Sequence, residues 1–248
     1  MFEIIAHRGC PDTAPENTIP AFLRALELGA DAVELDVRLT ADRVLVVYHY
    51  FYLDKITDLT GPIFTRTWDQ ISRARFQNAS GSEIGIPLLE QVLDVLAGRM
   101  GLEIEIKGPE TESVDVLASI LQNHPKAREN LEITSYEPML LKRFQSLVPD
   151  VPIDLLIPRS EPWMGRDVVA YTALQRGRMA GARALHLHPS QLDFDTVNLI
   201  RKGGCEVHTW DVNDHASMKV VQELRIPRLD TDTLQLALAF RERENNGT

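Results

Sequence analysis

The sequence predicts an α/β protein, a (β/α)8 TIM barrel with an inserted lid or subdomain after the second strand. Short apolar runs alternate with longer amphipathic segments along the chain, a pattern typical of a parallel sheet covered by helices. The chain has 248 residues, which is the usual length of one such barrel. We therefore expect a single domain over residues 1–248, with the insertion at about residues 50–87.

Nine short apolar runs are the predicted strands, at residues 3–6, 32–37, 44–48, 102–106, 131–134, 152–157, 184–187, 206–209 and 227–230. Apolar residues recur at helical spacing between most of them. The first helix, for example, is expected over residues 18–28 and ends before Gly29, a residue that favours the left-handed conformation found after helices. Further helices are predicted at residues 88–96, 113–123, 138–147, 167–179, 195–202, 216–224 and 233–241. The polar tail, residues 241–248, is expected to fray.

The second and third predicted strands are too close together for a parallel connection. Residues 38–43 alone separate them, whereas a parallel crossover needs a dozen or more residues. We expect an antiparallel hairpin that turns at about Ala41-Asp42, and counting it as an extension of the second strand leaves eight strands. A two-residue loop would place His49 opposite Glu34, with Asp36 on the same face of the sheet.

The stretch from residue 50 to residue 87 fits no barrel unit. It is rich in glycine and proline, and we interpret it as a lid or small subdomain above the strand ends, where barrel enzymes build specificity. It also contains six aromatic residues, Tyr50, Phe51, Tyr52, Phe64, Trp68 and Phe76.

Composition and charge exclude several classes of function. The 26 Lys and Arg residues against 36 Asp and Glu residues give a net charge of −10, which opposes nucleic acid and anionic membranes as partners. No window approaches 18 consecutive apolar residues, and the N-terminus lacks the pattern of a signal peptide, so we expect no membrane insertion and a cytoplasmic protein. A small anionic substrate and a cation held by carboxylates remain compatible, and the oligomeric state is left open.

Acidic side chains alternate with apolar ones at the ends of two predicted strands. Glu34 and Asp36 are two residues apart, so in a strand they point to the same side, while their apolar neighbours face the helices. Unpaired charges inside the barrel are costly, and a divalent cation would offset them. Oxygen ligands suit Mg2+ or Ca2+. Glu105 lies nearer the end of its strand than Glu103 and is the predicted third ligand.

Histidines and basic residues are expected beside these acids. His7 and His49 both fall at predicted strand ends, and two imidazoles across a scissile bond can act as an acid/base pair. Lys107 follows on the face of Glu105 and could touch an anionic group of the substrate. Alternatively, the acids pair with Arg8 and Lys107 as buried salt bridges. The number of chemically active groups at the strand ends favours a functional site.

The remaining five histidines are less informative. His186 and His188 flank the end of a later strand, and one of them could line the pocket. His124, His208 and His215 are expected at the surface or in packing.

Short motifs follow one another in a fixed order along essentially the whole chain. They are His7-Arg8-Gly9, Pro15-Glu16-Asn17-Thr18, Glu34-Leu35-Asp36-Val37, Val47-Tyr48-His49, Ile86-Pro87-Leu88-Leu89-Glu90, residues 102–107, Ser135-Tyr136-Glu137-Pro138, Trp210-Asp211-Val212-Asn213 and Thr231-Asp232. In this order they resemble the glycerophosphodiester phosphodiesterase family.

The resemblance implies a metal-dependent (β/α)8 enzyme that cleaves glycerophosphodiesters, such as deacylated phospholipids, into glycerol 3-phosphate and an alcohol. By position, His7 and His49 match the family's acid/base histidines. The metal carboxylates, which usually hold Ca2+ or Mg2+, correspond to Glu34, Asp36 and Glu105. The positions that contact the phosphate correspond to Arg8 and Lys107, and Trp210 is expected to contact the substrate.

The chain departs from the family pattern next to the second histidine. Tyr50 replaces an aspartate, and Lys55 replaces an arginine, whose planar fork a lysine lacks. The nearby aromatic residues could be core or could form an apolar wall for a larger alcohol group. Two alternatives therefore stay open: a related phospholipid-cleaving barrel acting on a lysophospholipid or a phosphoinositol-type head group, and an inactive barrel that binds a phosphodiester.

Overall fold

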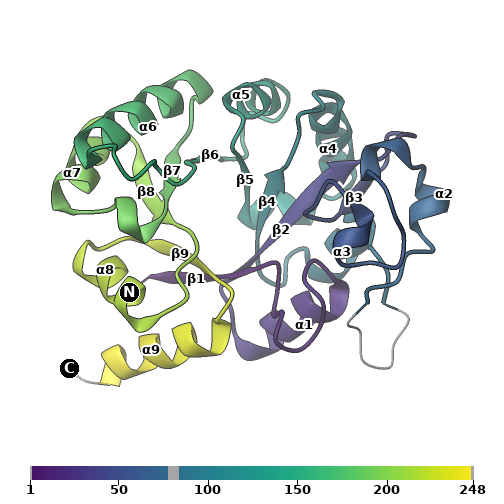
Figure 1. Cartoon of the computed structure of the whole chain (residues 1–248), viewed down its shortest axis with the longest axis horizontal. Coiled ribbons are helices and arrows are strands. Elements are labelled where there is room, and N and C mark those ends of the chain that lie inside the picture. Colours follow the sequence, from purple (N-terminus) through teal and green to yellow (C-terminus); the bar gives the residue numbers. More distant parts are fainter. Residues whose placement is uncertain (1, 78–83, 247–248) are drawn as a thin grey trace.

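Eight parallel strands close into a barrel in the computed structural model, which describes residues 2–77 and 84–246 (Figure 1). Around the barrel the strands follow the order β1, β9, β8, β7, β6, β5, β4 and β2, and β1 pairs with β2 to close it. All nine predicted strands are confirmed to within two residues. They are β1 (Glu3–His7), β2 (Ala32–Leu39), β3 (Leu45–Val47), β4 (Gly101–Ile106), β5 (Leu131–Ser135), β6 (Ile153–Leu156), β7 (Ala184–Leu187), β8 (Glu206–Thr209) and β9 (Arg228–Thr231).

Helices surround the barrel and connect its strands. They are α1 (Ile19–Leu28), α3 (Leu89–Leu96), α4 (Glu112–Asn123), α5 (Pro138–Leu147), α6 (Arg166–Ala180), α7 (Phe194–Lys202), α8 (His215–Glu223) and α9 (Leu234–Asn246). The last helix corrects one expectation, because the polar tail is helical as far as Asn246 rather than frayed from residue 241, while residues 247–248 lie outside the description. Among the described helices, none is long and apolar enough to cross a membrane.

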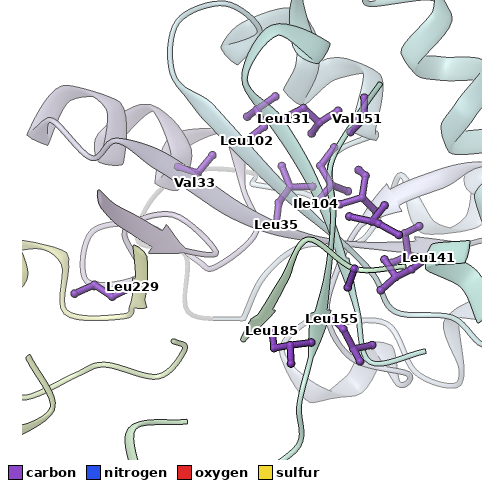
Figure 2. Packing of buried hydrophobic residues seen from close by; sticks show 14 of the residues in the cluster. Val33, Leu35, Leu102, Ile104, Leu131, Leu141, Val151, Leu155, Leu185 and Leu229 are labelled. Atoms are coloured by element: carbon purple, nitrogen blue, oxygen red, sulfur yellow. The ribbon is translucent and has the colours of Figure 1, made fainter. Parts of the chain in front are cut away.

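The two faces of the strands differ sharply in polarity. Apolar residues such as Val33 and Leu35 on β2 and Ile104 on β4 face the helices and form the main core (Figure 2). The alternate positions point into the barrel, which is ordinarily filled by branched apolar residues. Here they include a set of buried charged or titratable residues: Glu34, Asp36, Glu103, Glu105, Glu132, Asp154, His186, His208 and Asp230.

The hairpin between β2 and β3 forms as predicted, but its expected register is wrong by one residue. The Tyr48 amide donates a hydrogen bond to the Asp36 carbonyl at 2.9 Å, so Tyr48 stands opposite Asp36, and the pairing of His49 with Glu34 does not occur. The loop has three residues rather than two. Arg43 takes the left-handed conformation with φ 61°, as in three-residue hairpin loops.

The insertion after β3 has a small core of its own. Its described residues, 50–77 and 84–87, form short helical turns, η1 (Leu53–Lys55), η2 (Ile63–Thr65) and α2 (Trp68–Ile71). Residues 78–83 of the predicted insertion lie outside the described ranges. The buried apolar cluster consists of Val46, Tyr48, Leu53, Ile63, Ile71, Ala74, Phe76 and Ile86. Three of the aromatic residues are not core, since Phe51, Tyr52 and Phe64 are 44%, 58% and 48% exposed.

Candidate active site

A cavity of about 200 Å³ opens at the carboxyl ends of the barrel strands. This is the end at which barrel enzymes place their chemistry. The cavity is lined by His7, Arg8, Glu34, His49, Glu103, Glu105, Lys107, Tyr136, Leu156, Trp210, Asp211 and Asp230. Seven of the eight site residues predicted from the sequence are in this lining, and the eighth, Asp36, lies directly behind it in contact with Arg8 and Lys107.

Three buried carboxylates come together where β2 and β4 lie side by side. Asp36 is in register with Glu105, and Glu34 precedes Asp36 on the same face. One oxygen from each of the three lies within 4.8 Å of the others. Asn17 fixes Asp36 from outside the sheet, because its Nδ2 donates to Asp36 Oδ2 at 2.7 Å and its Oδ1 accepts from the Asp36 amide at 3.1 Å.

Two cations partly neutralise this carboxylate cluster. Lys107 Nζ lies 2.7 Å from Glu105 and 3.3 Å from Asp36, and Arg8 Nε lies 3.1 Å from Asp36. The buried salt bridges considered from the sequence are therefore present. Although burial alone would raise it, Lys107 and Arg8 hold the pKa of Asp36 well below its usual value. Three carboxylates against two cations leave one negative charge, and burial with the neighbouring Asp36 raises the pKa of Glu34 well above its usual value.

The carboxylate cluster fits a divalent cation. Within residues 2–77 and 84–246, Glu34 Oε1 is buried without a hydrogen-bond partner, and Asp36 Oδ1 is buried with the Lys107 ammonium, 3.3 Å away, as its ion-pair partner. Buried acceptors of this kind cost free energy unless something satisfies them. An all-oxygen donor set suits a hard cation such as Ca2+ or Mg2+.

His7 is oriented by an acid that follows β9. Its Nδ1 lies 2.7 Å from Asp232 Oδ1, and its Nε2 lies 3.8 Å from Glu34. Asn213 holds Asp232 in place, donating to its carboxylate at 2.9 Å and accepting from its amide at 2.8 Å. Although burial disfavours the imidazolium, the hydrogen bond to Asp232 and the charge of Glu34 raise the pKa of His7 to about 9. His7 is therefore protonated at neutral pH.

His49 reaches the cavity although the hairpin register differs from the one expected. The strand ends at Val47, so the next residues no longer alternate with the sheet. Arg38 Nε donates to the His49 carbonyl at 2.7 Å, and the Tyr50 ring packs edge-on against the imidazole with centroids 4.7 Å apart. Burial and the nearby Lys107 and Arg8 charges lower the pKa of His49 to about 3, against the opposing effect of Asp36. His49 is thus neutral.

Several residues of the site were not singled out from the sequence. Asn17 and Asp232 belong to the motifs but had no role assigned to them. The contacts through which they position Asp36 and His7 join segments that are far apart in the sequence. His208, expected at the surface or in packing, is buried and packs beside His186 in a polar network inside the barrel. The strand of His208, Glu206–Thr209, has only four residues and no apolar residue after the histidine, so alternation gave no signal for this position.

Comparisons with known proteins find relatives along nearly the whole chain. The family model described as the glycerophosphoryl diester phosphodiesterase family matches residues 7–236. A glycerophosphodiester phosphodiesterase from Caldanaerobacter subterraneus subsp. tengcongensis is 31% identical over 242 residues, which cover 92% of this chain and 93% of that protein. The crystal structure of a glycerophosphodiester phosphodiesterase from Agrobacterium tumefaciens is 27% identical, with a TM-score of 0.79 over 96% of this chain and 100% of that one. A phosphodiesterase from Oleispira antarctica, solved with the product sn-glycerol-3-phosphate, shares the fold with a TM-score of 0.83 at 24% identity, covering 96% and 95% of the two chains.

Proposed function

Because the chain belongs to the glycerophosphoryl diester phosphodiesterase family, we propose that it hydrolyses glycerophosphodiesters to glycerol 3-phosphate and an alcohol. In this proposal Glu34, Asp36 and Glu105 hold a divalent cation, Ca2+ or Mg2+, and His7 and His49 transfer protons. The observation that carries the proposal is that two histidines, His7 with a raised pKa and His49 with a lowered pKa, line one cavity beside one buried carboxylate cluster. The Oleispira relative, solved with glycerol 3-phosphate as its product, supports the substrate class.

Charge explains why the site would need a cation before it binds substrate. The three carboxylates outnumber Arg8 and Lys107 by one, so the protein alone presents a net negative charge to an anionic phosphodiester. The protonated His7 and the Asp232 carboxylate form a neutral pair, so a divalent ion would make the charge of the carboxylate cluster with Arg8 and Lys107 positive by one, which the substrate's single negative charge would neutralise. When bound, such an ion neutralises phosphate charge and lowers the pKa of a nearby hydroxyl.

The two histidines divide the proton transfers between them. His49 is neutral and accepts a proton from the attacking hydroxyl, which belongs either to the glycerol of the substrate or to water. His7 is protonated, with Nδ1 held by Asp232, so the proton on Nε2 is free to move to the departing alkoxide. Pairs of groups whose environments push their pKa values apart commonly mark the acid and the base of an active site.

Arg8, Lys107 and Trp210 bind the substrate in this proposal. Arg8 and Lys107 are held at the cavity by the acids and present positive charge to the phosphate. Trp210 forms one wall, anchored by a hydrogen bond of 3.2 Å from its Nε1 to the His186 carbonyl. The Tyr136 ring packs edge-on against it, with centroids 6.3 Å apart.

The proposal is tested by the products that the purified protein releases. Glycerophosphocholine and glycerophosphoethanolamine are incubated with the protein in Ca2+, in Mg2+ and in EDTA, and glycerol 3-phosphate and the free alcohol are measured. We expect equal amounts of both products with at least one ion and none in EDTA. No glycerol 3-phosphate with any ion, across several head groups, would refute the proposal.

A lysophospholipid is a second candidate substrate, favoured by the exposed aromatic residues of the insertion. Phe51, Tyr52 and Phe64 are each more than two-fifths exposed, and Phe51 packs under the Arg38 guanidinium at 3.9 Å. The same assay with lysophosphatidylcholine decides between glycerophosphodiesters and lysophospholipids as the substrate class. A higher kcat/KM for the acylated substrate than for glycerophosphocholine, reduced by Phe51→Ala, would favour the lysophospholipid.

A further inference from the structure

A second group of potential metal ligands lies deeper in the barrel than the carboxylate cluster. It consists of Glu103 on β4, His186 on β7 and Asp230 on β9, with one donor atom of each within 4.8 Å of the others. Glu103 and Asp230 also line the cavity. Glu103 precedes Glu105 by two residues on one strand, so the two positions are roughly 7 Å apart along it. Glu34 of the carboxylate cluster is in register with Glu103 on the neighbouring strand, so the two groups adjoin each other but share no ligand.

The distances within this group are those of ligands rather than of hydrogen bonds. His186 Nδ1 lies 3.7 Å from Glu103 Oε1 and 3.7 Å from Asp230 Oδ2, which is too long for a hydrogen bond. Two ligands of a tetrahedral zinc ion, each at about 2.0–2.1 Å from the metal, lie about 3.4 Å apart. Small movements of the side chains would bring all three donors onto one ion.

The donor atoms are buried and lack other partners. His186 is 0% and Glu103 is 1% exposed. In the part of the chain that the structure describes, His186 Nδ1 and both carboxylate oxygens of Glu103 have no hydrogen-bond partner. A buried polar group left in this condition costs free energy, and more when it is charged. A bound ion would satisfy all three atoms at once.

A chain of hydrogen bonds is compatible with the tautomer of His186 that a metal requires. His208 Nε2 lies 3.4 Å from the Glu206 carboxylate, and His208 Nδ1 lies 3.1 Å from His186 Nε2. If His208 donates to Glu206 from Nε2 and accepts at Nδ1, His186 donates from Nε2, which also lies 3.5 Å from Asp154 Oδ2. With that arrangement the lone pair of His186 lies on Nδ1, facing Glu103 and Asp230. Metal-binding histidines usually donate their other N–H to a neighbour in this way. Although burial opposes it, the neighbouring Asp154 and Asp230 carboxylates raise the pKa of His186 to about 9 when no ion is bound, so a metal would displace the Nδ1 proton.

The charges inside the barrel leave room for a divalent ion. Four carboxylates belong to this network: Glu103, Glu132, Asp154 and Asp230. Two guanidinium groups oppose them, since Arg183 binds Glu132 and Asp154, and Arg228 binds Glu132 at 2.7 Å. Two negative charges remain, on the carboxylates that the arginines do not bind. Either one divalent cation or two retained protons would balance them.

We propose that Glu103, His186 and Asp230 form a second divalent-cation site on the floor of the cavity, suited to a transition metal such as Zn2+. An imidazole nitrogen beside two carboxylates favours zinc over calcium, whereas the all-oxygen cluster above it has the opposite preference. The site is independent of the reaction proposed for the cavity, although its ion adds positive charge beneath the bound substrate.

Zinc binding in the presence of excess Ca2+ tests this site, because Ca2+ occupies the all-oxygen cluster. Metal-free protein is dialysed against Zn2+, and bound zinc is counted by elemental analysis. We expect one zinc ion per wild-type chain and none in Glu103→Gln. Glu105→Gln is the matched control, a carboxylate two residues away on the same strand, and it should keep its zinc. X-ray absorption at the zinc edge should show an imidazole nitrogen in that variant.

Folding is checked for each variant by circular dichroism and thermal melting, and Asp230→Asn provides a second removal of one ligand. The absence of zinc from the wild-type chain at saturating Ca2+ would overturn the proposal. Two retained protons would then balance the two remaining negative charges. Zinc retained equally by folded Glu103→Gln and Asp230→Asn would overturn it as well. Loss of glycerophosphodiester hydrolysis alone would bear on the first cluster and not on this one.

Discussion

Replacing Asp232 by asparagine is expected to move the pH dependence of turnover without removing a proposed proton donor. Asp232 accepts a hydrogen bond of 2.7 Å from His7 Nδ1, and Asn213 fixes it on the other side. A hydrogen bond to a charged group contributes about 1.5–3 kcal/mol. One pKa unit corresponds to about 1.4 kcal/mol. The pKa of His7, raised to about 9 against the effect of burial, should therefore fall by roughly one to two units.

The assay is the pH profile of kcat at saturating substrate and Ca2+. Because His7 must carry a proton to act as the acid, turnover is lost as pH rises through its pKa, so His7 sets the basic limb. Asp232→Asn should move that limb down by roughly one to two units. Asp211→Asn is the control, since Asp211 also contacts Asn213, at 3.1 Å, but pairs with Arg159 instead of His7. An unmoved basic limb in Asp232→Asn, or the same shift in the control, would refute the role assigned to His7.

Three further outcomes are expected. His7→Ala and His49→Ala should each lower kcat at least ~100-fold, the lower range for general acid–base catalysis, and a near-wild-type kcat in either would remove it from the mechanism. Lys107→Met should tighten Ca2+ binding by about 10-fold or more, since it removes a positive charge from Glu105, and should raise KM; weaker Ca2+ binding by calorimetry would contradict this. In EDTA, the free energy of unfolding should decline from about pH 6.5 to pH 9, because the folded-state pKa of His7, about 9, exceeds its ordinary 6.5. Urea titrations should show a shallower decline in Asp232→Asn, and a stability that rises over this range would contradict the assignment.

The strands and the carboxylate cluster of Glu34, Asp36 and Glu105 could be predicted from the sequence because both depend on local periodicity. The alternation of Val33, Glu34, Leu35 and Asp36 predicts which side chains enter the barrel, and the structure brings Glu34 and Asp36 together with Glu105. A period of two residues is a property of the chain itself. The alternation of side chains in a strand therefore does not depend on tertiary contacts.

The remaining features depend on contacts that a pattern does not encode. The hairpin register depends on a single residue, Arg43, whose left-handed conformation accompanies a loop of three residues instead of two. Asp232 faces His7 from the opposite end of the chain, 225 residues away. The strand that carries His186 has four residues, so its alternation is too short to distinguish an inward histidine from a packed one.

The ion dependence of glycerol 3-phosphate release tests the central claim most directly. Metal-free protein and its Glu105→Gln variant are titrated with Ca2+ and with Mg2+ while release from glycerophosphocholine is followed. The account predicts no release without an ion, saturable activation of the wild type, and activation of the variant only at much higher ion concentration. Full turnover by the metal-free wild type, or identical activation of the two proteins, would contradict it.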